Sequence, residues 1–296
     1  MSRKGLLLFL ACGFAWGIPY FFIKVAAQDF SPSMIILARV VIGAAALAPL
    51  AIKRGAFMPA LKAWKVSLAF ALFEMAGPWW LVTTAEKGHI SSGLAGLLIA
   101  TVPFFAMAVT YYYLGEKSAV HRKNIMGLGI GFVGIFLLVG IDAITHNLEI
   151  VWVGAVILAA VGYAIAPAIA QKRAPQVEQI GIIVVSMIFV AIIYVIPAAI
   201  TPFASGVTSP KWESWVALLV LGVVCSAIAF VLFFALMKEI GFSRASLITY
   251  VNTAVAIFLG VLFASEPLTI GMWVGFPLVA VGSYLASRRH AERAKS

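Results

Sequence analysis

Glu74 is an acidic residue near the middle of an apolar run, Trp64 to Thr84, that contains no other carboxylate. An ionised carboxylate in hydrocarbon is strongly unfavourable unless it is protonated, paired or in contact with water. Such a group can meet a substrate ammonium or take up a proton during a transport cycle. A neutral glutamate that is hydrogen-bonded to a neighbouring helix fits the sequence equally well, so both interpretations stand.

Two apolar runs carry aromatic and proline residues at similar places. Trp16 and Tyr20 share one face of the first run by helical spacing, with Pro19 beside them, and Tyr163 and Pro167 form the counterpart in the sixth run. Trp and Tyr at helix ends commonly anchor a protein at the membrane interface. Because Trp16 and Tyr163 lie about midway along their runs, we expect them to line a cavity instead.

Polar side chains gather on the ninth run and, more sparsely, on the fourth. They can bind a substrate carboxylate or hydroxyl, or they can form hydrogen bonds between helices, which contribute about 0.6 kcal/mol on average. As a group, the ninth-run residues favour a substrate site, because Asn252 is too polar to face lipid. The candidate residues are Ser92 on the fourth run and Ser246, Thr249, Tyr250, Asn252 and Thr253 on the ninth.

Lys24 and Arg39 are predicted to lie near the outer ends of the first two runs. Long basic side chains at such places can extend to the lipid headgroups. Glu74 is expected roughly 15 Å away along a helix, so we expect neither residue to pair with it directly.

Other reactive residue types form no catalytic pattern. The four histidines fall in loops or tails, and His89 alone is a candidate residue at the outer mouth. Cys12 and Cys225 lie inside apolar runs, so we expect no disulfide, no metal site and no cofactor. The sequence has no Walker loop, no HExxH and no GxSxG motif, which argues against an enzyme and against ATP-driven transport.

Hydrophobic residues make up 63% of the chain and charged residues 11%, and the mean hydropathy is +1.07. A soluble domain has about 45–50% apolar and about 25% charged residues. The sequence therefore predicts an all-α integral membrane protein. The formal charge of +10 lies in short clusters between apolar runs, which favours an anionic lipid surface over nucleic acid as the partner.

Ten runs are long enough to cross a hydrocarbon core, which takes about 20 helical residues. The predicted spans are Gly5 to Ala26, Met34 to Ile52, Trp64 to Thr84, Ser91 to Leu114, Ile125 to Ile141, Ile150 to Ala170, Gln179 to Thr201, Trp215 to Met237, Ala245 to Ala264 and Gly271 to Ser287.

The basic residues predict the orientation. We expect the protein to lie in the plasma or inner membrane with both termini in the cytoplasm. In that orientation, all but four of the 21 lysines and arginines fall on the cytoplasmic side. The remaining four are Lys24, Arg39, Lys87 and Lys211.

A faint internal copy supports a duplication. Ala85 to Glu116 and Ala235 to Glu266 align without a gap, and each ends an apolar run with a lone glutamate. Five spans in each half would place the second half upside down. We therefore predict two inverted five-helix repeats, residues 1–148 and 149–296, around a site near the midplane.

Several motifs resemble the drug/metabolite transporter superfamily and its EamA branch. They are Trp16-Gly17 followed by Lys24, Ser31-Pro32 followed by Arg39, Pro103 followed by Gly115-Glu116, and the second copy of that frame from Thr253 to Glu266. The chain is most similar to the YddG-type amino-acid exporters of that branch. Thr253 stands where the family usually has proline, so a backbone break there should be weaker. The prolines expected to break or gate helices are Pro19, Pro78, Pro103 and Pro167.

The resemblance implies a secondary transporter with a central cavity and alternating access. We expect it to export small amphipathic metabolites, above all amino acids, including aromatic or other apolar ones. Efflux of cationic drugs and carriage of sugars or nucleotide-sugars remain alternatives within the superfamily, and a membrane enzyme or receptor is the alternative outside it. Glycines such as Gly131, Gly134 and Gly282 could pack helices within one chain or join two copies in a homo-oligomer.

Overall fold

The computed structural model describes residues 2–115, 125–127, 129–134, 136–137, 149–241 and 245–287. Within these ranges the chain is helical, apart from an isolated antiparallel bridge between Phe30 and Phe203. The predicted loop from Asp142 lies outside the described ranges up to residue 148, as do Glu116 and the C-terminal tail from residue 288. The predicted positions of the termini therefore stay predictions.

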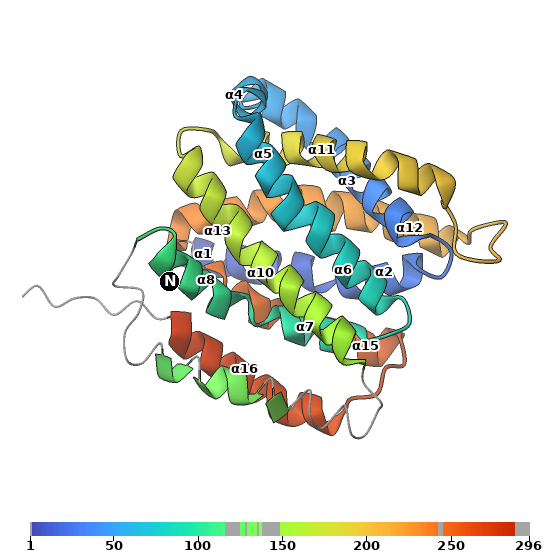
Figure 1. Ribbon diagram of the computed structural model, residues 1–296, viewed down its shortest axis with the longest axis vertical. Coiled ribbons are helices and arrows are strands. Elements are labelled where there is room, and N and C mark those ends of the chain that lie inside the picture. The colour runs from blue at the N-terminus through green and yellow to red at the C-terminus, as the bar shows by residue number, and fades with distance from the viewer. Residues whose placement is uncertain are drawn as a thin grey trace, which may run out of the picture.

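Helices of the first half occupy the blue-to-green part of the ribbon in Figure 1. They are α1 (Arg3–Gly17), α2 (Pro19–Ala26), α3 (Pro32–Lys53), α4 (Phe57–Lys62), α5 (Trp64–Phe70), the π-helix η1 (Ala71–Ala76), α6 (Gly77–Glu86), α7 (Ser92–Ile99) and α8 (Val102–Tyr112). The short helix α4 between the second and third spans was not predicted.

Helices of the second half follow in the yellow-green to red part. They are α10 (Ile150–Arg173), α11 (Gln179–Ile200), α12 (Trp212–Gly222), the π-helix η3 (Val223–Ile228), α13 (Ala229–Ile240), α15 (Ile248–Phe263) and α16 (Ile270–Ser287).

Seven helical stretches in the described residues are long and apolar enough to cross a membrane. The helix α15 and the apolar part of α16, Ile270–Gly282, are shorter, and the fifth predicted span falls partly outside the described ranges. Large apolar side chains such as Leu7, Leu158 and Ile196 point outward and are exposed. A water-soluble protein rarely exposes so much contiguous apolar surface, and in a membrane it would face lipid. The chain is thus a multi-pass helical membrane protein, while the number of ten spans stays a prediction.

Proline interrupts two of the spans. The first span is divided at Ile18, where α1 ends and Pro19 starts α2, and the fourth is divided so that Pro103 lies in the first turn of α8. Proline has no N–H and is tolerated best at the start of a helix. The prediction of a break at Pro167 is wrong, because α10 continues through it. The ninth span continues through Thr253 without a break, whereas the sequence led us to expect a weaker one.

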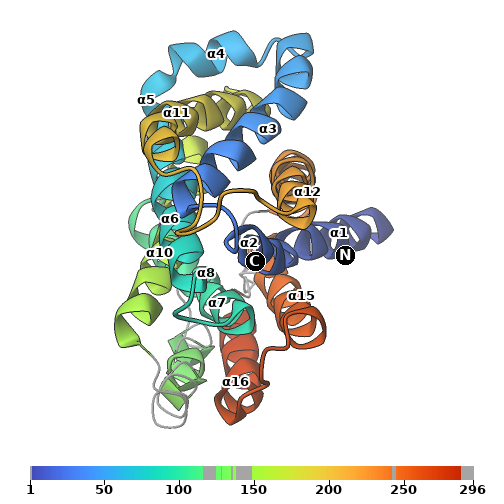
Figure 2. The same cartoon turned by 90° about the vertical axis from the view of Figure 1, so that its right-hand side faces the viewer.

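The two halves interlock rather than stand side by side. Helix α3 packs along α11, α1 along α15, and α12 along α2. Figure 2 shows these pairs joining blue elements to yellow, orange and red ones. Gly13 and Gly17 allow the close approach of α1 to α15, because a Cβ at either position would lie 2.5 Å from the Cβ of Val251 or Val255. A substitution there would force the two halves apart.

Glycines of the predicted fifth and tenth spans meet within one chain. A Cβ at Gly282 would collide with the backbone of Gly131, and one at Gly134 would lie 2.8 Å from the Cβ of Leu278. These glycines therefore bring two helices of the same chain together. They give no support for a homo-oligomer, which therefore stays a prediction.

Candidate functional site

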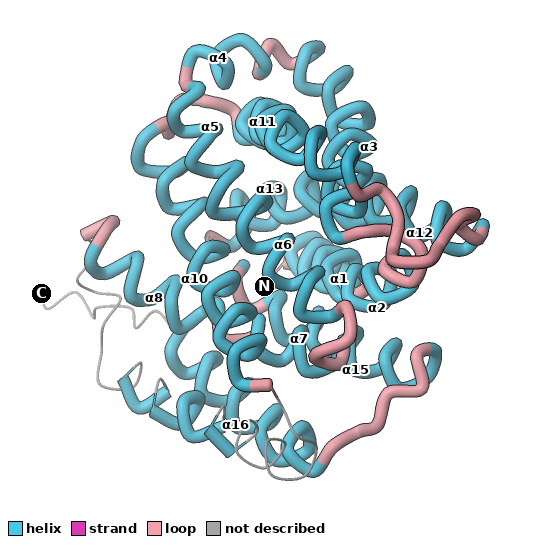
Figure 3. Tube along the Cα trace, turned by 45° about the vertical axis from the view of Figure 1, so that its right-hand side comes forward, coloured by secondary structure: helices cyan, strands magenta, loops and turns pink. Residues whose placement is uncertain are grey.

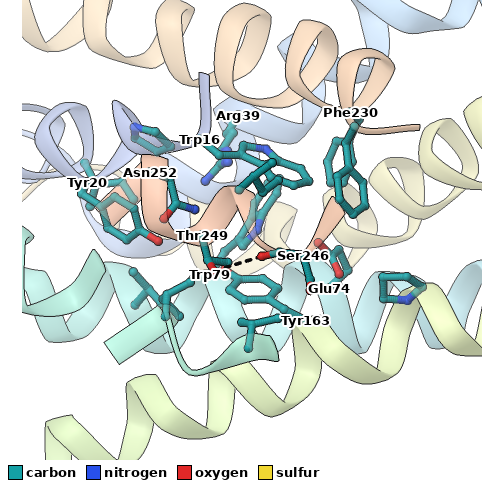
Figure 4. A pocket seen from close by; sticks show the side chains of 18 residues that line it. Trp16, Tyr20, Arg39, Glu74, Trp79, Tyr163, Phe230, Ser246, Thr249 and Asn252 are labelled. Carbon is teal, nitrogen blue, oxygen red and sulfur yellow. Dashed lines mark hydrogen bonds between the residues drawn. The ribbon is translucent and has the colours of Figure 1, made fainter. Parts of the chain in front are cut away.

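A cavity of about 840 Å³, open solvent included, lies among helices from both halves. Its wall combines aromatic and aliphatic side chains with one arginine, one glutamate and three small polar residues (Figure 4). The lining residues are Trp16, Pro19, Tyr20, Ile23, Arg39, Glu74, Trp79, Val82, Ile99, Val102, Tyr163, Pro167, Phe230, Phe233, Ser246, Ile248, Thr249 and Asn252.

Arg39 lies inside the protein on α3, with a relative exposure of 6%. Its Nε donates to Ser226 Oγ at 2.8 Å and its Nη2 to the Cys225 carbonyl at 3.4 Å. The guanidinium also stacks on Trp79 at 3.6 Å from the ring centroid, in cation–π geometry. The prediction that Arg39 extends to the headgroups is wrong, because the second half supplies acceptors that hold it at the cavity.

The acceptors of Arg39 lie in η3, the π-helical segment of the eighth span. A π-helical turn disturbs the regular i to i+4 hydrogen bonds and is frequent at functional sites. The carbonyl of Cys225 also accepts a hydrogen bond from Trp16 Nε1 at 3.1 Å. One irregular turn thereby fixes two side chains of the cavity wall.

Glu74 lies in η1, the π-helical segment of the third span, and is 7% exposed. Its Oε2 is buried and has no hydrogen-bond partner among the described residues. The α10 helix approaches this turn closely, because a Cβ at Gly162 would collide with the Phe73 carbonyl. The irregular turn therefore directs the Glu74 carboxylate into the cavity. Its Oε2 accepts no hydrogen bond from the described part of the neighbouring helices.

Arg39 and Glu74 enter the cavity from different helices, α3 and η1 (Figure 4). Among the described residues, no ion pair within 4.0 Å joins them, which agrees with the expectation that Glu74 has no direct basic partner. Opposite charges on the wall of one cavity attract a ligand that carries both signs.

Aromatic rings form much of the remaining wall. Trp16 contacts Phe230 edge-on at 5.4 Å between ring centroids and Phe233 at 4.7 Å. Tyr20 and Tyr163 also reach the cavity, so the structure brings together the aromatic residues that the sequence singled out.

The polar residues Ser246, Thr249 and Asn252 contribute one side of the wall from the start of α15 and the segment before it. Thr249 Oγ1 donates to the Ser246 carbonyl at 3.0 Å, the dashed line in Figure 4. A hydroxyl that donates to a nearby backbone carbonyl remains able to accept from a ligand.

Three other predicted site residues lie away from the cavity wall. Thr253 Oγ1 donates to the Gly96 carbonyl at 2.7 Å and links α15 to α7. Ser92 Oγ donates to the Tyr20 carbonyl at 3.2 Å. Tyr250 is not among the lining residues, and its buried hydroxyl has no partner among the described residues. None of the three lines the cavity, and Thr253 and Ser92 join helices. A role for these residues in substrate binding stays a prediction.

His89 lies between α6 and α7 and does not line the cavity. Its Nδ1 is 3.0 Å from Glu149 Oε1, and its ring stacks on Trp152 at 4.3 Å between centroids. The hydrogen bond with His89 holds the pKa of Glu149 below its usual range.

The four prolines divide into two groups. Pro19 and Pro167 reach the cavity, whereas Pro78 and Pro103 lie in the first turns of α6 and α8 without lining it. A gating role for any of them stays a prediction.

Lys24 does not simply extend to the headgroups as predicted. Its Nζ pairs with Glu266 Oε1 at 2.6 Å, and the Lys24 side chain is 38% exposed. The pair joins α2 to the chain just after α15. The sequence could not show this contact, because its partners are separated by 242 residues.

The described residues contain no cluster of three or more His, Cys, Asp or Glu that could hold a metal ion. The cavity wall offers one carboxylate and a guanidinium, which does not resemble the ligand set of a metal site.

The sequence is similar to those of known transporters. The model of the EamA-like transporter family matches the chain twice, over residues 3–140 and 150–288. The chain is 24% identical to the uncharacterized inner membrane transporter YedA of Escherichia coli K12, over 91% of this chain and 88% of that protein. It is 23% identical to the uncharacterized transporter YoaV of Bacillus subtilis, over 95% of this chain and 96% of that protein.

A solved crystal structure shares the fold. It superposes with a TM-score of 0.68 at 18% sequence identity and covers 96% of this chain and 98% of its own. At that identity the likeness concerns the fold alone.

Proposed function

The chain belongs to the EamA-like transporter family, and from this premise we propose that it exports zwitterionic amino acids with aromatic or other apolar side chains. The observation that carries the proposal is the presence of Arg39 and Glu74 on the wall of one largely apolar cavity. An α-amino acid presents a carboxylate, an ammonium and a side chain, and the cavity has a matching group for each.

Arg39 is suited to bind the substrate carboxylate. Two of its five N–H groups donate to Ser226 and Cys225, and the others have no partner among the described residues. Its Nε bond and its stacking on Trp79 fix the plane of the guanidinium before a ligand arrives. A pre-positioned guanidinium can bind a carboxylate through two parallel hydrogen bonds, which are stronger than neutral ones.

Glu74 is suited to bind the substrate ammonium. Its unpartnered Oε2 can accept an N–H from the ligand. Burial makes such a charged hydrogen bond stronger than it would be in water. The substrate would thus neutralise both charged groups at once, while Trp16, Tyr163 and Phe230 surround its apolar side chain.

The same groups argue against the other substrate classes of the superfamily. A cationic drug would meet Arg39, whose positive charge disfavours it. A sugar has many hydroxyls, whereas Ser246, Thr249 and Asn252 are the small polar side chains on this wall. Both alternatives are outcomes of the experiment below.

Transport would proceed by alternating access of the cavity between the two halves. Export, rather than uptake, follows from the resemblance to amino-acid exporters. The name of the relative YedA supports location in an inner membrane, and the basic-residue bias supports cytoplasmic termini.

Counterflow into proteoliposomes tests the proposal. Vesicles containing the purified protein are loaded with unlabelled phenylalanine, and uptake of labelled amino acids, a quaternary ammonium drug and a labelled sugar is compared. We expect counterflow for apolar and aromatic amino acids alone. Equal or faster counterflow of the drug or the sugar would contradict the proposal.

Two alanine variants test the aromatic wall in the same assay. Trp16→Ala and Tyr163→Ala should lower the preference for aromatic over small amino acids by about 10-fold, since an aromatic contact and its buried area contribute about 1–2 kcal/mol. Equal loss for every substrate, together with aggregation on size-exclusion chromatography, would show that these residues only pack.

A further inference from the structure

A second charged site lies at the end of α6, apart from the wall of the cavity. Glu266 accepts from Lys24 Nζ at 2.6 Å and from the backbone N–H groups of Ser92 at 2.9 Å and Gly93 at 3.2 Å. Gly260 makes room for this carboxylate, because a Cβ there would collide with Oε2. The Lys24–Glu266 pair therefore fastens α2, the start of α7 and the end of α15 to one another.

Glu86, the last residue of α6, is buried, with a relative exposure of 3%, and interacts electrostatically with both members of this pair. Neither of its carboxylate oxygens has a hydrogen-bond partner among the described residues. Helix α6 packs against α2 and α7, which carry Lys24 and the N–H groups that bind Glu266. Glu86 thus lies on a helix packed against α2, whose Lys24 is already engaged by a different carboxylate.

The charged and titratable groups that face Glu86 come from several elements. They are Glu266, Lys24 and Arg39, together with Tyr20 and Tyr163. Lys24 neutralises Glu266, and Arg39 is held by η3 at the cavity, so an ionised Glu86 would add a negative charge without a counter-ion in contact. A buried unpaired charge is strongly unfavourable, and the carboxyl group becomes neutral by binding a proton.

We propose that Glu86 is a proton-binding site that couples transport to the pH gradient, and that the Lys24–Glu266 pair determines when the proton is held. The proposal rests on the function proposed above, because it needs a transported substrate. In the conformation described here, Glu86 holds the proton. Tyr20 and Tyr163, which line the cavity, interact electrostatically with Glu86 and connect the site to the cavity.

Release of the proton follows from competition for Lys24. When α7 and α15 move during the cycle, Glu266 loses the N–H groups of Ser92 and Gly93 and its hold on Lys24. Lys24 can then pair with Glu86, whose O–H proton passes to water. The reverse movement restores the Lys24–Glu266 pair, and Glu86 takes a proton from water again. One proton is bound and released in each cycle, and no covalent bond other than O–H changes.

A proton fits this site better than a metal cation. Hard cations require about six or more oxygen ligands, whereas the two carboxylate oxygens of Glu86 have no polar partner at hydrogen-bond distance among the described residues. Sodium dependence is therefore the competing outcome of the test.

The first experiment measures uptake of labelled phenylalanine into proteoliposomes that contain the wild-type protein, with unlabelled phenylalanine inside for the counterflow arm and none inside for the gradient arm. Counterflow without a gradient establishes transport by itself. An imposed gradient of one pH unit should then drive accumulation of about 10-fold if one proton moves per substrate, since one unit corresponds to a factor of ten. Counterflow without any response to pH gradients of either polarity would overturn the proton site and leave the proposed function standing. Loss of the response when choline replaces sodium would also overturn it.

A variant then assigns the effect to one carboxyl group. Glu86→Gln keeps the size of the side chain but cannot lose a proton, so counterflow should remain and pH-driven accumulation should disappear. The matched control is Glu149→Gln, which removes a carboxylate from the loop between the halves and should keep the accumulation. A Glu86→Gln protein that still accumulates substrate under a pH gradient would overturn the proposal.

Chemical modification tests the site without any substitution. Dicyclohexylcarbodiimide reacts with protonated carboxyl groups in apolar surroundings, so treatment of the wild-type protein at pH 7 should modify Glu86. Glu149 is the internal reference, because its exposed carboxylate should stay unmodified. Peptide mass spectrometry that finds no adduct on Glu86 would overturn the proposal, even if Glu86→Gln failed to fold.

Discussion

The two π-helical segments, η1 and η3, lie at corresponding places in the two halves and serve the cavity differently. Each divides its span, the third and the eighth, into two α-helices. The flanking helices, α5 and α6 around η1 and α12 and α13 around η3, are labelled in Figure 3. In η1 a side chain, Glu74, reaches the cavity directly. In η3 the backbone carbonyl of Cys225 and the hydroxyl of Ser226 hold a residue of the other half, Arg39.

The difference shows how a duplicated backbone feature can produce an asymmetric site. A π-helical turn alters the local hydrogen-bond pattern in both halves, but the residue types around it decide what it presents. The Ala76 carbonyl at the end of η1 accepts from Tyr194 at 2.8 Å, whereas the Cys225 carbonyl in η3 accepts from Trp16 and Arg39. The Ala76 carbonyl in η1 thus joins two packed helices, whereas the Cys225 carbonyl in η3 holds two side chains of the cavity wall.

Removal of the charge that η3 holds should have the largest effect. Arg39→Gln should weaken amino-acid binding by about 100-fold, because a charged hydrogen-bond partner contributes about 1.5–3 kcal/mol. Binding can be measured by isothermal titration in detergent. Arg39→Lys keeps the charge but not the planar fork and should restore the affinity only in part.

An amine without a carboxylate is the control ligand for Arg39. Phenethylamine lacks the group that Arg39 is proposed to bind, so its affinity should not fall in Arg39→Gln. An equal fall for phenethylamine and phenylalanine would show that Arg39 stabilises the fold and does not recognise the carboxylate.

Removal of the charge in η1 should have the next largest effect. Glu74→Gln keeps the size of the side chain and its capacity for hydrogen bonds, so we expect about 10-fold weaker binding of phenylalanine through loss of a charged bond. Phenylpropionate, which lacks the ammonium, should bind Glu74→Gln at least as well as the wild type. Normal transport with unchanged pH dependence and substrate choice would show that Glu74 is structural.

A matched pair of phenylalanine substitutions tests the two carbonyls. Trp16→Phe removes the hydrogen bond to Cys225 in η3 and should reduce phenylalanine affinity by about fivefold, from a bond of about 1 kcal/mol. Tyr194→Phe removes the bond to Ala76 in η1 and should lower thermal stability without changing affinity. The comparison between the segments would fail if Tyr194→Phe reduced affinity as much as Trp16→Phe.

The smallest effect is expected at Asp29, in the connection between α2 and α3, far from either segment. Hydrogen bonds from Ser214 at 2.6 Å and from the Lys211 N–H at 2.8 Å hold its pKa below the usual range. A lowered pKa in the folded state adds stability above the unfolded value, about 3.9, that is lost as the pH falls through the folded value. Asp29→Asn should therefore unfold at a lower temperature at pH 7 and show a smaller drop between pH 5 and pH 3.

Glu149→Gln is the comparison for Asp29→Asn. Its carboxylate also has a lowered pKa but is exposed to solvent, so its removal should change the pH profile less. Thermal unfolding in detergent, followed by circular dichroism, measures both. An identical profile for Asp29→Asn and the wild type would contradict the role of Asp29.

The sequence by itself determined the class of protein and much of the wall of the cavity. Its apolar content allowed no water-soluble fold, and the length of its apolar runs located the helical stretches within a few residues. Helical spacing put Trp16 and Tyr20 on one face, and the isolation of Glu74 in an apolar run marked it as a residue that must be protonated, paired or in contact with water. These properties depend on neighbours within one helix, so the sequence contains them.

Only the tertiary structure decided which way Arg39 and Lys24 face. A basic residue near the end of an apolar helix can reach either the headgroups or a polar group inside, and its own helix does not distinguish the two. The choice depended on Ser226 and Glu266, which lie 187 and 242 residues further along the chain. The same holds for Thr253 and Ser92. Their hydroxyls donate hydrogen bonds to carbonyls that helix packing brings within reach from adjacent helices. Packing of the two halves set the rotation of each helix, and the rotation set the chemistry of the site.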